Sequence, residues 1–255
     1  MKYSFLIIFI ACGITAFSDE PAVPGYTDTP FLPNSVWRVH DQSRPQPVKV
    51  APGQGDIGVK PPSDAVVLFD GSHLNQWKGK NLNAIEDGAF DIFKTGQLVT
   101  KDEFGSCQLH LEWMTPTKPV DRMEWGNSGV YLLGGIEIQI IESCDSHIYA
   151  DGNAGAVYGQ YPPLVNPARK PGEWQSFDIV FTAPKIKDGT QTEPARVTVF
   201  YNGVLVQNNV EIIGASLHRA LPKPLKREKG HILLQEHHSP VKFRNIWVRP
   251  LADNK

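Results

Sequence analysis

The sequence predicts an all-β protein, an antiparallel sandwich of two sheets in the jelly-roll arrangement. Short runs of β-branched and aromatic residues alternate with polar residues, and turn-forming pairs such as Asp70-Gly71 and Asn202-Gly203 separate these runs. No segment keeps a helical hydrophobic period. About a dozen short strands with this punctuation are typical of a sandwich or jelly roll, and a closed barrel is the alternative.

Individual strands follow from the period of the side chains. Residues 107–115 give the clearest one, because Leu109 and Leu111 face one side of the sheet while His110 and Glu112 face the other. Residues 196–201 and 204–207 flank Asn202-Gly203, which predicts a type I′ hairpin. A second hairpin is expected from residues 89–93 and 97–100. The other expected strands cover residues 66–69, 128–133, 136–140, 175–182, 231–236 and 242–248.

The N-terminal residues predict export. Residues 1–18 have the pattern of a signal peptide, with Lys2, a short apolar run and a small-x-small cleavage site that ends at Ser18. A lipoprotein signal that ends at Cys12 is the alternative, and either route leads to the periplasm or the extracellular space. No later segment is apolar for long enough to span a membrane.

Between the signal and the domain lies a segment rich in proline and glycine, residues 19–62, which predicts an extended arm or tether. A flexible leader is the favoured interpretation. Residues 36–39 are the exception, because this short apolar run is able to dock on the domain surface. The β-sandwich domain is expected over residues 63–252.

Composition narrows the function. The 255-residue chain has a formal net charge of −2 and no basic stripe, which argues against nucleic acid as a partner. In an oxidising compartment Cys107 and Cys144 either form a disulfide or remain as two buried thiols. No nucleophile elbow, phosphate loop or zinc spacing is present. No cofactor is therefore required, although a calcium ion at Asp145 or Asp151 stays open, as does the oligomeric state.

The strand at residues 136–140 carries the most informative polar groups. Glu137 and Gln139 face one side, and the isoleucines between them face the other. If the doubled Ile140-Ile141 contains a β-bulge, Glu142 joins the face of Glu137. Without the bulge, Glu142 ends the strand and points toward the core or solvent. Polar groups in so apolar a strand need partners or a ligand.

Other candidates lie further along the chain. Gln235 and His237 share a face if their strand continues, and imidazole is well suited to proton transfer near neutral pH. Arg244 has a planar fork that suits a sugar hydroxyl or an enolate oxygen. Glu112 belongs to the same cleft floor or to a solvated outer face. The long loop at residues 143–171 is expected to be functional or disordered, and its tyrosines, among them Tyr158, favour order.

Residues 137–142 resemble the bulged acidic signature of laminarinase-type retaining β-glucanases. In that family the first Glu is the nucleophile and the last is the acid/base, so Glu137 and Glu142 would take these roles. The family has an Asp where this chain has Gln139, and an amide is unable to relay a proton for the nucleophile.

A broader resemblance covers most of residues 64–250. An opening motif and seven further motifs in order are similar to those of the 3-keto-disaccharide hydrolase family, and together they imply a concanavalin A-like lectin/glucanase sandwich with a carbohydrate cleft. They further imply cleavage of glycosides whose glucosyl C3 is a ketone. Beyond the opening Leu68-Phe69-Asp70-Gly71 with Trp77, the motifs are Asn127-Ser128-Gly129-Val130-Tyr131, Ile136-Glu137-Ile138-Gln139-Ile140, Gly155-Ala156-Val157-Tyr158-Gly159, Pro171-Gly172-Glu173-Trp174, Asn202-Gly203-Val204, Leu234-Gln235-Glu236-His237 and Pro240-Val241-Lys242-Phe243-Arg244-Asn245-Ile246.

The implied chemistry assigns hypothetical roles to the candidates. A C3 ketone acidifies the C2 proton, so a base removes it, the enolate expels the group on C1, and water then adds. We expect His237 or Glu137 as the base, and Glu142 as the acid that protonates the leaving oxygen. The candidate substrate-binding residues are Gln139 and Arg244 at the oxyanion, Tyr158 and Trp174 as stacking surfaces, and Gln235, Asn127 and Glu112. A non-catalytic carbohydrate-binding module on the same fold is the alternative, and a plain retaining β-glucanase is the second.

Overall fold

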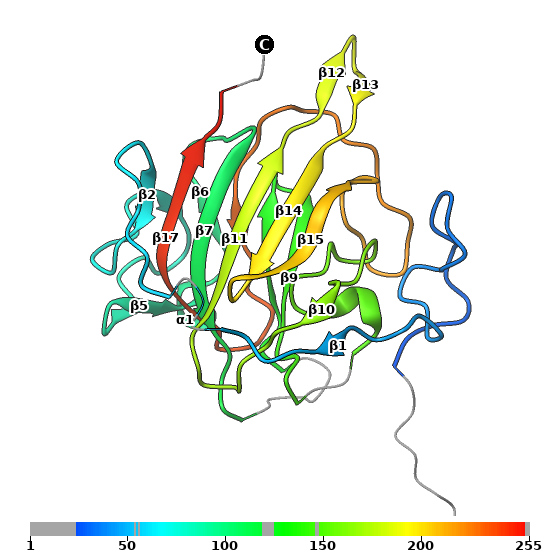
Figure 1. The fold of residues 1–255 in the computed structure, drawn as a ribbon. Coiled ribbons are helices and arrows are strands. Elements are labelled where there is room, and N and C mark those ends of the chain that lie inside the picture. The colour runs from blue at the N-terminus through cyan, green and yellow to red at the C-terminus, as the bar shows by residue number, and fades with distance from the viewer. Residues whose placement is uncertain (1–23, 54, 56, 119–124, 146–147, 253–255) are drawn as a thin grey trace, which may run out of the picture.

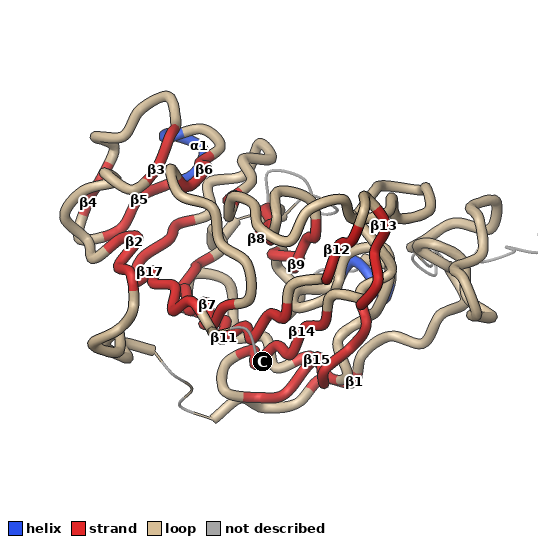
Figure 2. Tube along the Cα trace, turned by 90° about the horizontal axis from the view of Figure 1, so that it is seen from above, coloured by secondary structure: helices blue, strands red, loops and turns tan. Residues whose placement is uncertain are grey.

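The structure, a computed structural model, describes residues 24–252 except 54, 56, 119–124 and 146–147. Two antiparallel sheets face each other and form a sandwich, which confirms the predicted fold class (Figures 1 and 2). The predicted signal peptide and Cys12 lie outside the described residues. No helix within the described part of the chain is long and apolar enough to cross a membrane.

The larger sheet has eight strands in the order β15-β14-β11-β7-β17-β5-β4, with β2 also paired to β17. The turn at Asn202 and Gly203 joins β14 to β15, and both residues have positive φ (51° and 77°), as the predicted type I′ hairpin requires. The strands are β2 Val66–Phe69, β4 Ile85–Glu86, β5 Ala89–Asp91, β7 Cys107–Met114, β11 Gln175–Thr182, β14 Arg196–Tyr201, β15 Val204–Glu211 and β17 Lys242–Pro250.

The smaller sheet has five strands in the order β3-β6-β16-β8-β9. Its strands are β3 Trp77–Lys78, β6 Leu98–Thr100, β16 Leu233–Leu234, β8 Ser128–Leu132 and β9 Ile136–Ile140. The strand expected at residues 231–236 is therefore only two residues long. Two further pairs lie outside the sandwich, β1 Val48–Lys49 with β10 Val165–Asn166 and β12 Lys185–Lys187 with β13 Thr190–Glu193.

The hairpin predicted for residues 89–100 is wrong. β5 belongs to the larger sheet and β6 to the smaller one, so the chain changes sheets between them. The short helix α1, Ile92–Thr95, makes this crossing. The other helical element within the described residues is the 3₁₀ turn η1, Ala150–Gly152, in the loop after β9. The Asp91 carboxylate accepts a hydrogen bond from the backbone N–H of Phe93 and so caps α1.

The core fills the space between the two sheets. Ile136, Ile138 and Ile140 of β9 are fully buried there, which fixes the opposite face of β9 outside the core. Aromatic rings from the larger sheet pack against them, with the Trp113 ring stacked on Tyr201 at 5.7 Å between centroids. Both described cysteines are free, so the disulfide between Cys107 and Cys144 is not formed.

The N-terminal arm, residues 24–62, packs on the sandwich, and its favoured interpretation as a flexible leader is wrong for the described residues. Val39 and His40 are fully buried. From there the arm crosses one end of the sandwich, where β1 pairs in parallel with β10 (Figure 1). It then reaches the outer face of the larger sheet, where the Val59 carbonyl accepts a hydrogen bond from the Asn245 side chain.

Candidate functional site

A pocket of about 360 Å³ opens on the outer face of the smaller sheet, a volume within the usual range of small-molecule sites. Six of the ten predicted site residues line it. The lining is Tyr26, Asn127, Tyr131, Glu137, Gln139, Ile148, Tyr149, Tyr158, Ser216, Leu217, His218, Gln235 and His237. Side chains separated by more than a hundred residues in sequence therefore meet in one cavity.

β8 and β9 place the central carboxylate. Glu137 and Gln139 point into the pocket because the isoleucines beside them face the core. Gly129 of β8 pairs with Gln139, and a Cβ there would lie 2.4 Å from Glu137 Oε1. The glycine of the predicted central motif therefore provides the space that the Glu137 side chain occupies.

Tyr131 links Glu137 to Gln235. Gln235 Nε2 donates to the Tyr131 hydroxyl at 3.1 Å, and that hydroxyl is hydrogen-bonded to the Glu137 carboxylate. Burial raises the pKa of Glu137 to about 7, although the Tyr131 hydrogen bond and the charge of His237 act in the opposite direction. Glu137 is consequently able to accept or release a proton near neutral pH.

His237 lies beside this carboxylate, although β16 ends at Leu234, before the position that the sequence pattern required. Its Nδ1 is 3.3 Å from Asn127 Nδ2. The preceding backbone is fixed by Ser128 Oγ, which donates to the Gln235 carbonyl at 2.6 Å. A carboxylate, an imidazole and two amides thus share one wall of the pocket.

Gln139 has a hydrogen-bonding group that is open to a ligand. Its side chain is buried, and Oε1 meets no partner among the described residues. A buried amide oxygen without a partner is costly, so a donor supplied by a bound molecule would stabilise it. A sugar hydroxyl is such a donor.

The opposite wall consists of aromatic residues. The Tyr158 hydroxyl is 2.7 Å from the Tyr149 hydroxyl and 3.0 Å from His218 Nδ1. The Tyr158 backbone N–H donates to the Glu137 carbonyl, which fixes the loop at residues 143–171 along the free edge of β9. Tyr149, Tyr158 and Tyr161 of this loop all make hydrogen bonds within the described residues, as their predicted order requires.

Glu142 lies outside the pocket, so its predicted role as an acid is wrong. β9 ends at Ile140 without a bulge, and the Glu142 carboxylate turns back to accept hydrogen bonds from the backbone N–H groups of Cys144 (2.6 Å) and Asp145. This is the alternative without a bulge, with Glu142 buried on the core side. The carboxylate closes a turn, as a capping group does.

Arg244, Trp174 and Glu112 also lie elsewhere, on the larger sheet, and their predicted place in the cleft is wrong. Arg244 Nε donates to Glu112 Oε2 at 2.7 Å, and the guanidinium lies 4.0 Å from the centre of the Trp174 ring. The arm covers this cluster, since the Gly58 N–H donates to Glu112. The error arises because β7 and β17 belong to the larger sheet, whereas the pocket lies on the smaller one.

Several pocket residues were missed by sequence reasoning. Tyr131 belongs to a predicted motif and alternates with core residues, so its period offered a signal. Tyr149 lies in the loop whose aromatic content was noted. Irregular segments supply Ser216, His218 and Tyr26. Such segments have no hydrophobic period from which the orientation of a side chain is predicted.

The candidate calcium ligand Asp151 does not fit that role. Both of its carboxylate oxygens accept hydrogen bonds from His40, at 2.9 Å from the backbone N and 3.0 Å from Nδ1. Across the described ranges, no group of three or more His, Cys, Asp or Glu side chains is arranged to hold a metal. A calcium ion at Asp145 stays a prediction.

The sandwich and its polar, tyrosine-lined pocket define a carbohydrate-active protein. The model of the 3-keto-alpha-glucoside-1,2-lyase-like domain matches residues 64–249. The chain therefore belongs to this family, the 3-keto-disaccharide hydrolase family that its motifs resemble. A comparison with curated proteins gives no match.

Solved structures agree with the assignment. A "putative glycosyl hydrolase" from Parabacteroides distasonis ATCC 8503 is 39% identical, with a TM-score of 0.72 over 82% of this chain and 93% of that chain. A second protein of the same description and organism is 21% identical, with a TM-score of 0.54 over 74% of this chain and 94% of that one. This second likeness supports the fold alone.

Proposed function

We propose that the protein is an exported enzyme that cleaves 3-keto-glucosides, disaccharides among them, by elimination across C1 and C2. The observation that carries the proposal is the pocket itself, in which Glu137, with its pKa raised to about 7, lies beside His237 and shares the lining with Gln139. A base of this pKa is half ionised near neutral pH, the condition under which proton transfer from an activated C–H is most efficient.

In the elimination step Glu137 removes the C2 proton of the keto sugar. The electron pair forms the C1=C2 double bond through the enolate, and the bond from C1 to the leaving oxygen breaks. His237 gives its proton to that oxygen, and Gln139 Nε2 donates to the C3 oxygen while it carries negative charge. The products are a 2-hydroxy-3-keto-glycal and a free alcohol or sugar.

The hydration step reverses these transfers. Neutral His237 accepts a proton from water as the water oxygen bonds to C1, and protonated Glu137 returns its proton to C2. Elimination and hydration together amount to hydrolysis, because one water molecule is consumed for each glycosidic bond that is broken. Tyr131 would stay protonated throughout, since burial raises its pKa well above the ordinary value.

The direct test is incubation of the protein with 3-keto-trehalose or a 3-keto-β-glucoside, with an unoxidised glucan as the control. Release of free sugar from the keto substrate, with transient absorbance of the unsaturated ketone, is the expected result. Cleavage of the glucan without cleavage of the keto sugar would overturn the mechanism.

The rival function is a carbohydrate-binding module on the same fold, and two variants separate it from an enzyme. Glu137→Gln and His237→Ala would abolish turnover by an enzyme while sugar affinity is largely kept. A binding module would have no turnover to lose. The retaining β-glucanase is not supported, because that mechanism needs a second carboxyl group about 5–5.5 Å from the first, and Glu142 binds backbone groups outside the pocket.

A further inference from the structure

The N-terminal arm contributes to the pocket although it precedes the family domain. The family match begins at residue 64, whereas Tyr26 of the arm is part of the pocket lining. The wall at this end is therefore an addition to the family domain. Its position is determined by contacts between the arm and two loops of the domain.

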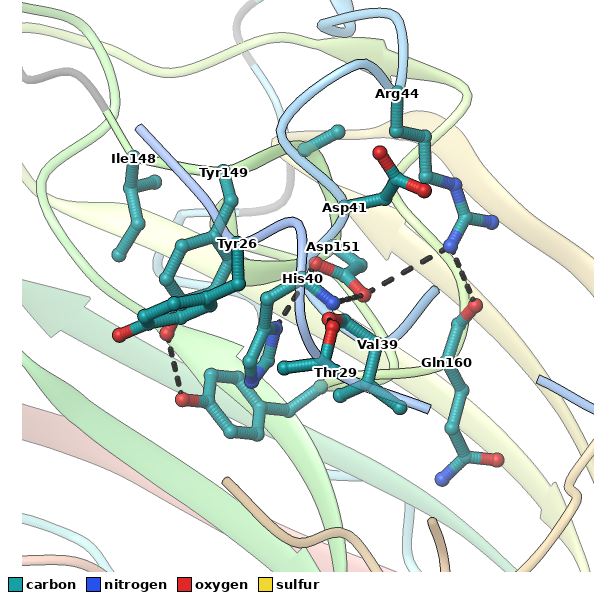
Figure 3. A network of polar contacts seen from close by, with 12 residues as sticks. Tyr26, Thr29, Val39, His40, Asp41, Arg44, Ile148, Tyr149, Asp151 and Gln160 are labelled. Atoms are coloured by element: carbon teal, nitrogen blue, oxygen red, sulfur yellow. Dashed lines mark hydrogen bonds and ion pairs between the residues drawn. The ribbon is translucent and has the colours of Figure 1, made fainter. Parts of the chain in front are cut away.

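A buried anchor holds the arm in place (Figure 3). Asp151 is fully buried and accepts two hydrogen bonds from His40 of the arm, one from its backbone and one from its ring. Arg44 Nη1 lies 3.8 Å from Asp151 Oδ2 and donates to the Gln160 carbonyl at 3.0 Å. Removal of the arm would leave the Asp151 carboxylate without these partners, so the anchor holds the arm firmly.

A second set of contacts connects Tyr26 to the loop at residues 212–232. The Arg219 guanidinium lies 4.2 Å from the centre of the Tyr26 ring and is bound by both carboxylate oxygens of Asp28, at 2.9 and 3.0 Å. The Tyr26 ring meets His218 edge to face at 5.8 Å. Tyr26 and His218 thus hold each other at the rim of the pocket.

Their place in the pocket indicates what they would contact. His218 Nδ1 is 3.0 Å from the Tyr158 hydroxyl, and the Glu137 carboxylate is close enough to raise the pKa of that hydroxyl further, although burial is the main cause of its rise. The Tyr26 hydroxyl lies 3.5 Å from His218 Nε2, so a line of contacts runs from Tyr158 through His218 to Tyr26. When the reacting sugar ring lies at Glu137, Tyr26 and His218 would lie beside the group attached to its C1.

We propose that Tyr26 and His218 form a subsite for the sugar ring that leaves C1, so that the arm makes the enzyme selective for disaccharides over keto sugars with a small aglycone. This inference rests on the proposed function. A tyrosine offers an apolar ring and a hydroxyl together, a combination that suits a sugar ring with its apolar face and polar rim. A methyl aglycone is too short to reach it.

The test compares Tyr26→Ala with wild type on a 3-keto-disaccharide and on the methyl 3-keto-glucoside. We expect KM for the disaccharide to rise about tenfold with kcat nearly unchanged, and both constants for the methyl glucoside to stay the same. Val36→Ala is the matched control, because Val36 lies on the same arm, is 76% exposed and is absent from the pocket lining. An equal effect on both substrates, or none on either, would overturn the subsite.

The anchor provides an independent variant. His40→Ala should loosen the arm, with faster protease cleavage within residues 24–46 and the same loss of disaccharide preference as Tyr26→Ala. Should the variant fail to fold, Tyr26→Ala still decides the question, because the hydrogen bonds to Asp151 come from His40 and the backbone bonds of Tyr26 to His40 and Gln42 survive the substitution.

A last measurement separates failure of the subsite from failure of the proposed function. Calorimetric titration with an unoxidised disaccharide and its methyl glycoside reports binding even if no keto sugar is turned over. Wild type should bind the disaccharide more tightly, and Tyr26→Ala should lose this advantage. Equal binding of both ligands by wild type would refute the subsite, whatever the outcome of the turnover assays.

Discussion

Gly129 and Glu137 occupy adjacent strands, and the absence of a side chain at the first makes room for the carboxylate of the second. A Cβ at Gly129 would lie 2.4 Å from Glu137 Oε1 and 3.1 Å from its Cδ. Gly129 also accepts a hydrogen bond from the Gln235 N–H, so its backbone ties β8 to the segment that carries His237. One glycine therefore leaves room for the proposed base and binds the segment that carries the proposed acid.

Gly129→Ala should displace the Glu137 carboxylate and lower kcat/KM on a keto sugar by about 100-fold, the cost of a misplaced catalytic group. Stability should fall by about 1–3 kcal/mol, since the added methyl group meets a filled site. Steady-state kinetics and urea unfolding measure the two effects. Gly53→Ala is the control, because a Cβ at Gly53 meets nothing within 4 Å. Activity of Gly129→Ala within about twofold of wild type would contradict the steric argument.

The sequence was sufficient for most strands of the sandwich and for the part of the site that β8 and β9 carry. The alternation of Glu137 and Gln139 with isoleucines determines which side chains leave the core, and the structure keeps that alternation. Motif order supplied Asn127, Gln235 and His237, although β16 ends before the last two. A turn rather than a strand places His237 in the pocket, so the strand that its prediction assumed is absent.

The misplacement of Glu112 and Arg244 has one physical cause, which is that periodicity gives the face of a strand but not the sheet to which the strand belongs. Glu112 and Arg244 have polar neighbours in β7 and β17, and their face of the larger sheet is covered by the arm. The arm itself shows no period, yet its buried His40 meets Asp151 more than a hundred residues away. Such a contact is visible only in three dimensions.

The pKa of Glu137 predicts the pH dependence of activity. A base must be ionised, so kcat/KM should decline as pH falls below about 7, where burial sets the pKa of this carboxyl. Tyr131→Phe removes a hydrogen bond that lowers the pKa of Glu137, and the acidic limb should therefore move to higher pH. A pH–rate profile of both proteins measures the shift. An unchanged acidic limb in Tyr131→Phe would mean that another group is the base.

Glu142→Gln tests whether Glu142 has a structural role in its turn and not the predicted role as the acid. The amide keeps one acceptor for the turn at Cys144 and Asp145 but loses the charge, so stability should fall by about 1–2 kcal/mol while kcat stays within about twofold. Thermal unfolding and turnover of the keto sugar provide the two measurements. A loss of kcat similar to that of Glu137→Gln, in a folded protein, would return Glu142 to the reaction.

The buried polar cluster on the larger sheet predicts how stability depends on pH. Burial disfavours the charged forms of His110 and Glu112, but hydrogen bonds outweigh it. Those from Asp178 and Glu112 raise the pKa of His110 to about 9, and those from His110, Asn245, Gly58 and Arg244 lower the pKa of Glu112 to about 2. The contribution of ionised Glu112 to the free energy of unfolding is present above its ordinary pKa of 4.5 and is lost as pH falls toward about 2.

The contribution of protonated His110 to the free energy of unfolding is complete below its ordinary pKa of 6.5 and is lost as pH rises through about 9. His110→Gln should therefore cost about 3 kcal/mol near the acidic side of neutrality, because Asp178 and Glu112 lose a buried partner, and the deficit should shrink as pH rises. Urea unfolding of both proteins across this range measures the difference. Glu211→Gln is the control, since its pair with Arg196 is exposed and should change stability by less than about 1 kcal/mol. A deficit for His110→Gln that is the same on both sides of its raised pKa would show that His110 is not charged in the folded protein.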